Sequence, residues 1–354
     1  NLTIAFAEQK TDINISLSAL GLLWNLTSVA QSSDMWITIL KQSYPLIGDP
    51  RNDVSICAVN TFFSLLVSNS QNLSKEVLKF LAVNVDNIID ILVENRPECE
   101  NAQMSAFHEL AHCARNLYTQ IDSVIDDQER IWDRFIKEHE KFILRCTKSE
   151  VVISSMLFYE EIFQCIHFSE ALFITTFDSL DRLMSHFIKT ENSNSPIYGT
   201  IGKMMKCSLS AQKEIMNVTF LKRWLKIIET LICDLDSGPC LPPTAHMSLD
   251  ALDTLFPLDE EMTYLLYESI VRIANYEPKQ ERDPAESNRM TEIAVDHLCR
   301  ICREKVPKKM LSKLFIMSKT LFKRKEARKL ILDFVSNDIP VDDDLVESVC
   351  NSLM

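Results

Sequence analysis

The sequence predicts an all-α chain of stacked helical hairpins, and three observations lead to that prediction. Glycine is scarce: average usage would give roughly 25 glycines in a chain of 354 residues, and this one has 5. Nucleotide-binding α/β folds, β-barrels and β-sandwiches need glycine at tight turns or beside a ligand, so these architectures are disfavoured. Apolar residues recur at steps of three and four, which is the helical period. The helices predicted from this period form pairs, and successive pairs begin about 40 residues apart.

The first helical pair is predicted over residues 13–47, with the apolar period running over 13–26 and again over 35–47. The first of these helices would bury one face, formed by Ile15, Ala19, Leu22, Leu23 and Leu26. A break follows, where we expect Asp49 to cap a new helix and Pro50 to occupy its first turn. The two pairs begin about 40 residues apart, which is the period of HEAT and armadillo repeats. The predicted fold is therefore a HEAT/armadillo-like helical-hairpin solenoid.

Roughly thirteen or fourteen helices are expected in all from this period. The later ones are predicted at 74–94, 102–121, 129–146, 150–168, 170–190, 209–235, 260–276, 288–305, 307–319, 321–336 and 342–354. Proline, glycine and polar residues mark linkers at 191–202, 236–257 and 277–288. We therefore divide the chain into N-terminal repeats (1–190), a linker with a long helix (191–235), a proline-rich extended segment (236–259) and C-terminal repeats with a basic patch (260–354).

Composition limits the possible functions. The net charge of −13 argues against nucleic acid as a partner, because phosphate binding needs a basic surface. No apolar run reaches the ~18 residues of a transmembrane helix. The 11 cysteines are scattered through apolar stretches, which indicates reduced thiols in a reducing compartment. The chain begins at Asn1 in the middle of an apolar pattern, so we expect a piece of a longer protein.

One motif favours an enzyme. The segment His108-Glu109-Leu110-Ala111-His112 satisfies H-E-x-x-H, in which two imidazoles on one helical face bind zinc and the glutamate acts as a general base. The extended pattern of one protease class would need glycine and histidine where this chain has Arg115 and Tyr118. We favour two structural histidines on a helix, and no metal or other cofactor. A zinc-dependent hydrolase remains the alternative from another functional class.

A second group, His297, Cys299 and Cys302, has the form H-x-C-x-x-C. A structural zinc site needs four ligands, and no second cysteine pair follows. The three residues lie in a helical apolar pattern, which favours buried thiols over a metal site.

A basic segment stands out within the acidic chain. Residues 300–329 are rich in lysine and arginine, and apolar residues lie among them. Each such charge contributes on the order of 1 kcal/mol near an anionic membrane. We expect binding to anionic lipid or an acidic partner, with pairing to the chain's own acidic residues as the alternative. The residues assigned to this patch are Lys319, Lys323, Arg324, Lys325, Arg328 and Lys329.

The N-terminal segment is similar to a known family. Residues 12–25 read D-I-N-I-S-L-S-A-L-G-L-L-W-N, with Asn14, Gly21 and Trp24 at signature positions. This resembles the N-I-S-L-T-A-[IV]-G-L-L-W motif of the Golgi and endosome scaffolds named for monensin sensitivity, the Mon family, which is related to the large Arf guanine-nucleotide exchange factors. The run Asp49-Pro50-Arg51 with its following helix resembles the family's D-P-R-x-x-V-R-x-x-A-x-x-T-L-F-S, although Ser55 replaces the second arginine.

The resemblance covers residues 1 to about 70. It implies a C-terminal HEAT-repeat portion of a peripheral protein on the cytosolic face of Golgi and endosome membranes, without a catalytic exchange module. The implied partners are a Dopey protein, an Arf-like GTPase and an aminophospholipid flippase. The function expected is that of a non-catalytic scaffold in protein and vesicle transport. The alternative within the same neighbourhood is the regulatory HEAT region of a large Arf exchange factor.

Overall fold

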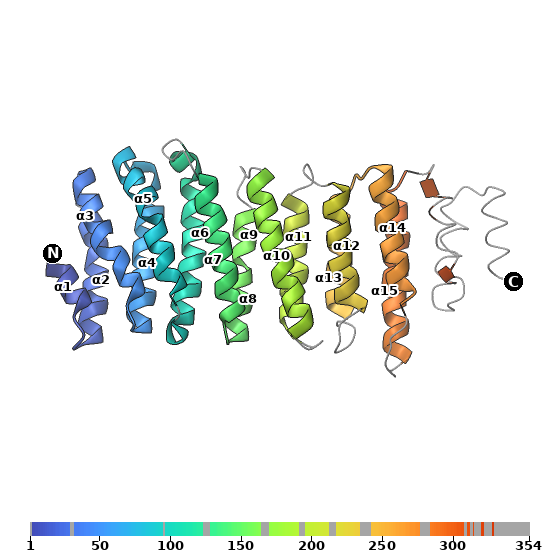
Figure 1. Cartoon of the computed structure of the whole chain (residues 1–354), viewed down its shortest axis with the longest axis horizontal. Coiled ribbons are helices and arrows are strands. Elements are labelled where there is room, and N and C mark those ends of the chain that lie inside the picture. The colour runs from blue at the N-terminus through green and yellow to red at the C-terminus, as the bar shows by residue number, and fades with distance from the viewer. Residues whose placement is uncertain are drawn as a thin grey trace. The chain divides into compact units, whose positions relative to one another are not determined.

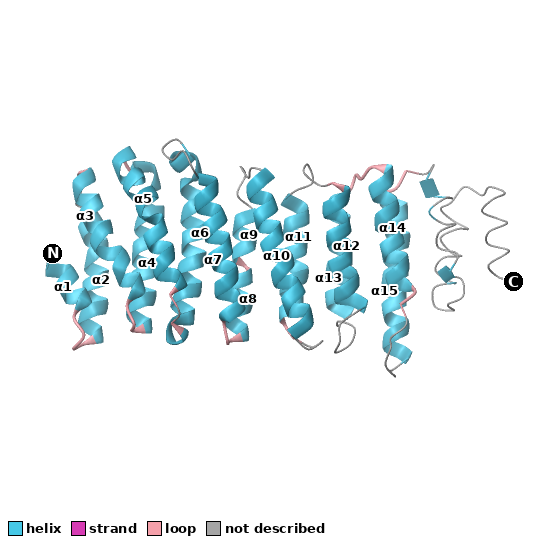
Figure 2. Ribbon diagram, in the orientation of Figure 1, coloured by secondary structure: helices cyan, strands magenta, loops and turns pink. Residues whose placement is uncertain are grey.

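The computed structural model describes residues 2–28, 32–94, 96–122, 128–163, 170–190, 195–211, 217–233, 242–276 and 284–307, with 310, 311, 314, 320, 321 and 328. Throughout these residues the regular elements are helices, and no strand occurs among them (Figure 2). The all-α prediction is thus confirmed. The chain divides into two compact units, residues 1–180 and 181–354.

Unit 1 consists of helical hairpins that follow a short first helix, α1 (Leu2–Glu8) (Figure 1). Helices α2, α4 and α6 pack in succession as one row, and α3, α5 and α7 pack as a second row. The α8 and α9 helices continue the first row beside α6. The bounds are α2 (Ile13–Ser28), α3 (Ser33–Ser43), α4 (Asn52–Ser68), α5 (Lys75–Val93), α6 (Glu100–Asp122), α7 (Gln128–Arg145), α8 (Ser149–Met156) and α9 (Phe158–Phe163).

Helix α10 (Glu170–Thr190) contains the boundary between the units. In unit 2, α11 packs on α13 and α13 packs on α15, while α12 packs on α14. The two-row arrangement of hairpins therefore recurs there. The bounds are α11 (Ile197–Ala211), α12 (Val218–Cys233), α13 (Pro242–Leu252), the 3-10 turn η4 (Asp253–Leu255), α14 (Glu260–Ala274) and α15 (Pro284–Glu304).

The core of unit 1 is apolar and rich in aromatic rings. Phe107 of α6 packs against Phe135 and Phe142 of α7, with ring centroids 5.6 and 5.2 Å apart. His139 of α7 is fully buried among these rings, and burial holds its pKa well below the usual value, so the imidazole is neutral. Thiols fill other core positions: five of the eight cysteines in the described residues are buried, and none of the eight forms a disulfide. Burial raises the pKa of Cys113 and Cys146 to about 12, so they behave as small apolar side chains.

Three arginines of unit 1 bind backbone carbonyls one repeat earlier. Arg51 donates to the carbonyls of Ala7 and Gln9, at 3.4 and 2.8 Å. Arg96 donates to those of Ile47 and Asp49, both at 3.4 Å, and Arg145 to those of Val93 and Glu94. Carbonyls at helix ends lack a partner within their own helix. Each arginine therefore supplies hydrogen-bond donors to backbone carbonyls in the turn of the preceding repeat.

A second set of polar contacts joins α5 with α7, α7 with α10, α10 with α12, and α12 with α14. The partners lie 42 to 48 residues apart in the sequence, which is one repeat. The contacts are Arg130 and Arg134 with Asp86 and Asp90, Thr175 with Asp133, Arg223 with Asp181, and Arg272 with Glu229. The polar pattern thus follows the same period as the hairpins.

The structure corrects the predicted long helix at 209–235 and the linker at 191–202. Two helices, α11 and α12, occupy this region, and α11 begins inside the expected linker. The glycines that suggested a loop lie within α11. A Cβ at Gly202 would meet Met247 Cβ of α13 at 3.3 Å, so this glycine permits close helix packing.

The proline-rich segment 236–259 is not extended throughout, because α13 and η4 lie within it. Pro242 and Pro243 occupy the first turn of α13, where a proline costs no hydrogen bond. The α4 helix begins at Asn52 rather than Pro50, and Asp49 accepts a hydrogen bond from the backbone N–H of Arg51 at 2.8 Å. The helices predicted beyond residue 307 lie outside the continuously described residues.

We expect Arg96→Leu to destabilise the protein by about 2 kcal/mol, because the carbonyls of Ile47, Asp49 and Ile91 would each lose a charged donor in a buried site. The Ile47 carbonyl would keep the Ser55 hydroxyl, and the Asp49 carbonyl would keep only the weak thiol donor of Cys99. The matched control is Arg130→Leu, whose ion pair with Asp86 is exposed and contributes less than about 1 kcal/mol. Urea unfolding of both variants measures the difference. Equal losses would contradict a special role for the carbonyl contacts.

The two glycines of α11 should respond differently to alanine. A Cβ at Gly199 meets nothing within 4 Å, so Gly199→Ala is expected to stabilise the helix by about 1 kcal/mol. Gly202→Ala gains the same propensity but presses on Met247, so it should remain the less stable of the two. Thermal melts of the pair test this order, and the reverse order would refute the packing explanation.

Candidate functional site

The resemblance residues Asp49 and Arg51 form a clamp between α4 and the α1–α2 turn. The Arg51 guanidinium makes a bidentate pair with Asp49, with Nε–Oδ1 and Nη2–Oδ2 distances of 2.9 and 2.8 Å. It also donates to Ser16 Oγ of α2 at 3.1 Å. Burial by itself raises the pKa of the Asp49 carboxyl, but the hydrogen bonds and charge of Arg51 outweigh it and hold that pKa below its usual value. The D-P-R run therefore fixes the first hairpins together.

The buried face predicted for α2 is confirmed at Ala19 and Leu23 but is wrong at Ile15, Leu22 and Leu26, which are exposed. The exposed side of α2 therefore concentrates apolar surface. Of the large apolar side chains that are exposed in the described residues, seven of twelve lie between residues 2 and 26. Exposed apolar side chains that gather in one region are typical of a contact surface. We call the residues involved the α2 face: Phe6 of α1, and Asn14, Ile15, Ser18, Gly21 and Leu22 of α2.

A shallow depression of about 320 Å³ lies in the α2 face, lined by Phe6, Ile15 and Leu22 among others. Gly21 is exposed beside it, and a Cβ at this position would meet nothing within 4 Å. Glycine inside a helix costs about 1 kcal/mol relative to alanine. No contact in the described fold explains this glycine. Trp24, the last signature residue, is 43% exposed one turn further along α2.

The H-E-x-x-H segment lies on α6, and the structure gives its first histidine a structural contact. His108 Nε2 lies 2.6 Å from the carbonyl oxygen of Ser154 in α8. Within the described residues, His108, Glu109 and His112 do not belong to any cluster of three or more groups with metal-ligating geometry. His108 thus joins α6 to the next repeat.

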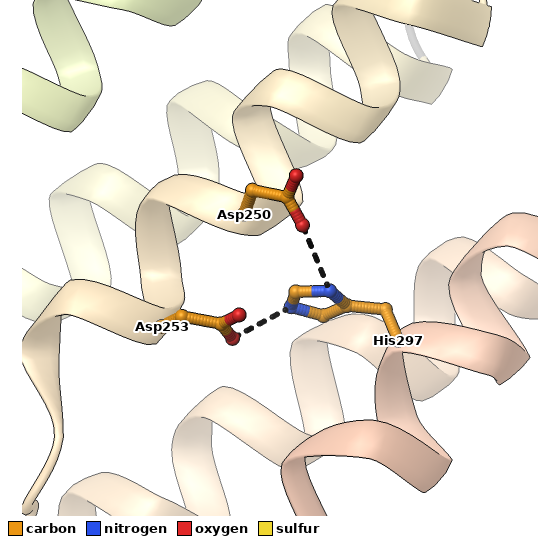
Figure 3. A group of neighbouring side chains, drawn as sticks. All are labelled: Asp250, Asp253 and His297. Atoms are coloured by element: carbon orange, nitrogen blue, oxygen red, sulfur yellow. Dashed lines mark ion pairs between the residues drawn. The ribbon is translucent and has the colours of Figure 1, made fainter.

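The H-x-C-x-x-C group is split by the structure. Cys299 and Cys302 are buried in α15, whereas His297 faces Asp250 of α13 and Asp253 of η4 (Figure 3). His297 Nδ1 lies 3.7 Å from Asp250 Oδ1, and Nε2 lies 3.5 Å from Asp253 Oδ1. These three side chains offer potential metal ligands, with ligand atoms within 4.8 Å of one another.

An arginine already supplies positive charge to this cluster. Arg300 donates to His297 Nδ1 at 2.7 Å, pairs with Asp250, and reaches Asp253 Oδ2 at 3.1 Å. Burial and the charge of Arg300 lower the pKa of His297 to about 4, although Asp250 opposes the shift. Burial raises the pKa of Asp253, against the opposing charge of Arg300. The group is a polar clamp that holds α15 against α13 and η4.

The two aspartates of this clamp were not singled out from the sequence, because they lie in the segment expected to be extended. Their helical spacing of three residues was the available signal. Of the basic patch assigned to the C-terminal region, Arg328 alone falls within the described residues, and Lys319, Lys323, Arg324, Lys325 and Lys329 lie outside them. None of the helices in the described ranges is long and apolar enough to cross a bilayer.

Comparison with known proteins identifies the fold. No protein-family model matches the chain, and no curated protein matches it in sequence. Among solved structures, the chain is similar to the N-terminus of TSC2, with a TM-score of 0.56 and 10% sequence identity over 99% of this chain and 86% of that one. At this identity the likeness shows the fold alone. The chain is thus a helical-repeat solenoid, as the repeat spacing predicted.

The polar clamp around His297 predicts that the stability of the protein depends on pH. His297 is neutral in the folded state down to about pH 4, whereas the unfolded chain binds a proton near pH 6.5, so this site's contribution to stability is lost as the pH falls between these values. From pH 7 to pH 5 the loss should be about 2 kcal/mol. We expect His297→Asn to reduce the pH dependence of urea unfolding by that amount. Parallel profiles for the two proteins would contradict the assignment.

Proposed function

We propose that this chain is a non-catalytic scaffold that presents helical-repeat surfaces to partner proteins. Solenoids bury a continuous core through contacts between neighbouring repeats and leave long surfaces for binding. The helical-repeat fold and the similarity to the N-terminus of TSC2 support this general role. The more specific role in Golgi and endosome transport, at the cytosolic face of those membranes, rests on the resemblance of residues 12–25 and 49–64 to the Mon family.

The observation that carries the proposal is the concentration of exposed apolar side chains between residues 2 and 26, within the segment that bears the resemblance. Phe6, Ile15 and Leu22 of this set lie on the α2 face. Buried apolar area contributes about 25 cal/mol per Å², so covering Ile15 and Leu22 alone would contribute several kcal/mol to an interface. The Arg51 clamp fixes this helix against α4. The surface is therefore rigid before a partner arrives, which lowers the entropic cost of binding. By the resemblance, the partner is a Dopey protein.

We expect the purified chain to capture a purified Dopey protein, and the double variant Ile15→Ser/Leu22→Ser to weaken this capture at least tenfold. Val83→Ser on α5 is the matched control, because that side chain is 77% exposed and lies outside the α2 face. Surface substitutions of this kind leave folding nearly unchanged, which circular dichroism verifies.

A parallel capture with GTP-loaded Arf-family GTPases distinguishes the scaffold from the regulatory region of an exchange factor. Binding to the GTPases without binding to Dopey would favour the exchange factor. Equal capture of Dopey by the wild type and the α2-face variant would remove this surface from the proposal.

A further inference from the structure

Helix α2 has fewer neighbours along its row than the helix that follows it. Helix α4 packs between α2 and α6, whereas α2 packs mainly on α4 and on α1, which has 7 residues against the 16 of α2. At the rise of an α-helix, α1 spans about 10 Å and α2 about 24 Å. Part of α2 is therefore left open, and Ile15, Leu22 and Leu26 are 43%, 54% and 40% exposed.

The α2 helix also lacks charge. No Asp, Glu, Lys or Arg occurs from residue 13 to residue 28, whereas each of the other α-helices in the described residues has at least one. In a contact about a two-fold axis the same patch occurs on both sides, so a charge on it lies near its own equivalent. Such like-charge contacts are costly. The α2 face carries none, and it can therefore meet a second copy of itself without repulsion.

The sizes of the side chains along α2 are self-complementary. Residues four positions apart form one ridge on a helix, and here the ridge consists of Asn14, Ser18, Leu22 and Leu26. In an antiparallel pair of α2 helices centred on residue 20, Leu22 of one copy lies opposite Ser18 of the other. Leu26 likewise lies opposite Asn14. Each large apolar side chain thus meets a shorter one, and each contact occurs twice.

Gly21 lies beside the centre of this ridge. It is exposed, and a Cβ at this position would meet nothing within 4 Å. Within the fold, Gly202 shows what such a residue permits, since α13 approaches α11 there and a Cβ would meet Met247 Cβ at 3.3 Å. We propose that two copies of this chain pair through their α2 faces, with the α2 helices antiparallel about a two-fold axis near Gly21.

The exposed apolar area indicates how strong the pairing is. Phe6, Ile15, Leu22 and Leu26 are each 40–54% exposed. On the scale of a whole aromatic side chain, these four together offer roughly 350 Å² of apolar surface per copy. Since interfaces are about 60% apolar, two such patches correspond to a total interface of roughly 1,200 Å². This lies at the lower end for specific interfaces, so we expect a dissociation constant on the order of 10 µM.

The pairing would regulate the surface assigned above to partner proteins. The inference rests on the proposed function in treating the α2 face as a contact surface, and it adds that the paired form hides this face. Pairing and capture of a partner therefore exclude each other. Below the dissociation constant of the pair, the face is free.

Sedimentation equilibrium of the full chain, at concentrations from about 1 to 200 µM, brackets the expected dissociation constant. We expect the mass to rise with concentration from 40.7 kDa toward twice that value. Ser18→Lys and Ser18→Glu should each weaken pairing about tenfold, because the new charge lies about 6 Å along the helix axis from its equivalent. An equimolar mixture of the two variants should pair again, since opposite charges then meet.

The substitutions at Ser18 should leave folding intact, because this residue is exposed and lysine and glutamate are good helix formers. Val83→Lys and Val83→Glu are the matched controls on α5, where the side chain is 77% exposed. They should leave the pairing of the chain within about twofold of the wild type, as expected for surface positions outside the contact.

Two results would overturn the proposal. A mass of 40.7 kDa at every concentration would show that the α2 face does not pair and would leave it to another protein. Pairing that the Ser18 variants do not weaken, or that their mixture does not restore, would place the contact on another surface. The measurement contains no partner protein, so its failure leaves the proposed function to the capture experiment.

Discussion

The contacts on which unit 1 most depends are those between an arginine of one repeat and the backbone carbonyls of the repeat before it. A hairpin solenoid must turn the chain at the end of every helix, and each turn leaves carbonyl groups without a partner in their own helix. Packing the next repeat against such a turn removes water from those groups, which is costly unless a donor replaces it. Arg51, Arg96 and Arg145 supply that donor at successive turns. Apolar packing holds the helices together, and the arginines make the junctions between repeats compatible with burial.

Much of this fold follows from the sequence because the apolar period is strong. Helix α10 was predicted with its observed bounds, and α2, α5 and α7 with bounds within two residues of those observed. The errors in unit 2 have one cause. Glycine and proline were treated as signs of loops, yet Gly202 lies inside a helix where α13 approaches closely, and Pro242 begins a helix. Glycine occurs both in loops and at close helix contacts, and proline both in loops and in the first turn of a helix. Only the tertiary neighbours of each residue decide between these alternatives.

The functional surfaces were less predictable, because they depend on which side chains meet across repeats. A histidine pair such as His108 and His112 looks alike whether a metal or a carbonyl faces it, and the Ser154 carbonyl that meets His108 is 46 residues away. The clamp at Asp49 and Arg51 was more accessible, since both residues lie in one short motif.

The open space around Gly21 bears on how readily this residue could be replaced by mutation. Glycine and alanine codons differ by one base, and the space around this position would accept the alanine methyl group without contact. The exchange would also strengthen α2, because alanine is the better helix former. A chain whose only requirement was to fold would gain by the change, so the fold alone gives no reason to keep a glycine here. If a glycine is maintained at position 21, its selection comes from a contact outside the described fold. The exposed helix backbone beside Leu22 is where that contact would form.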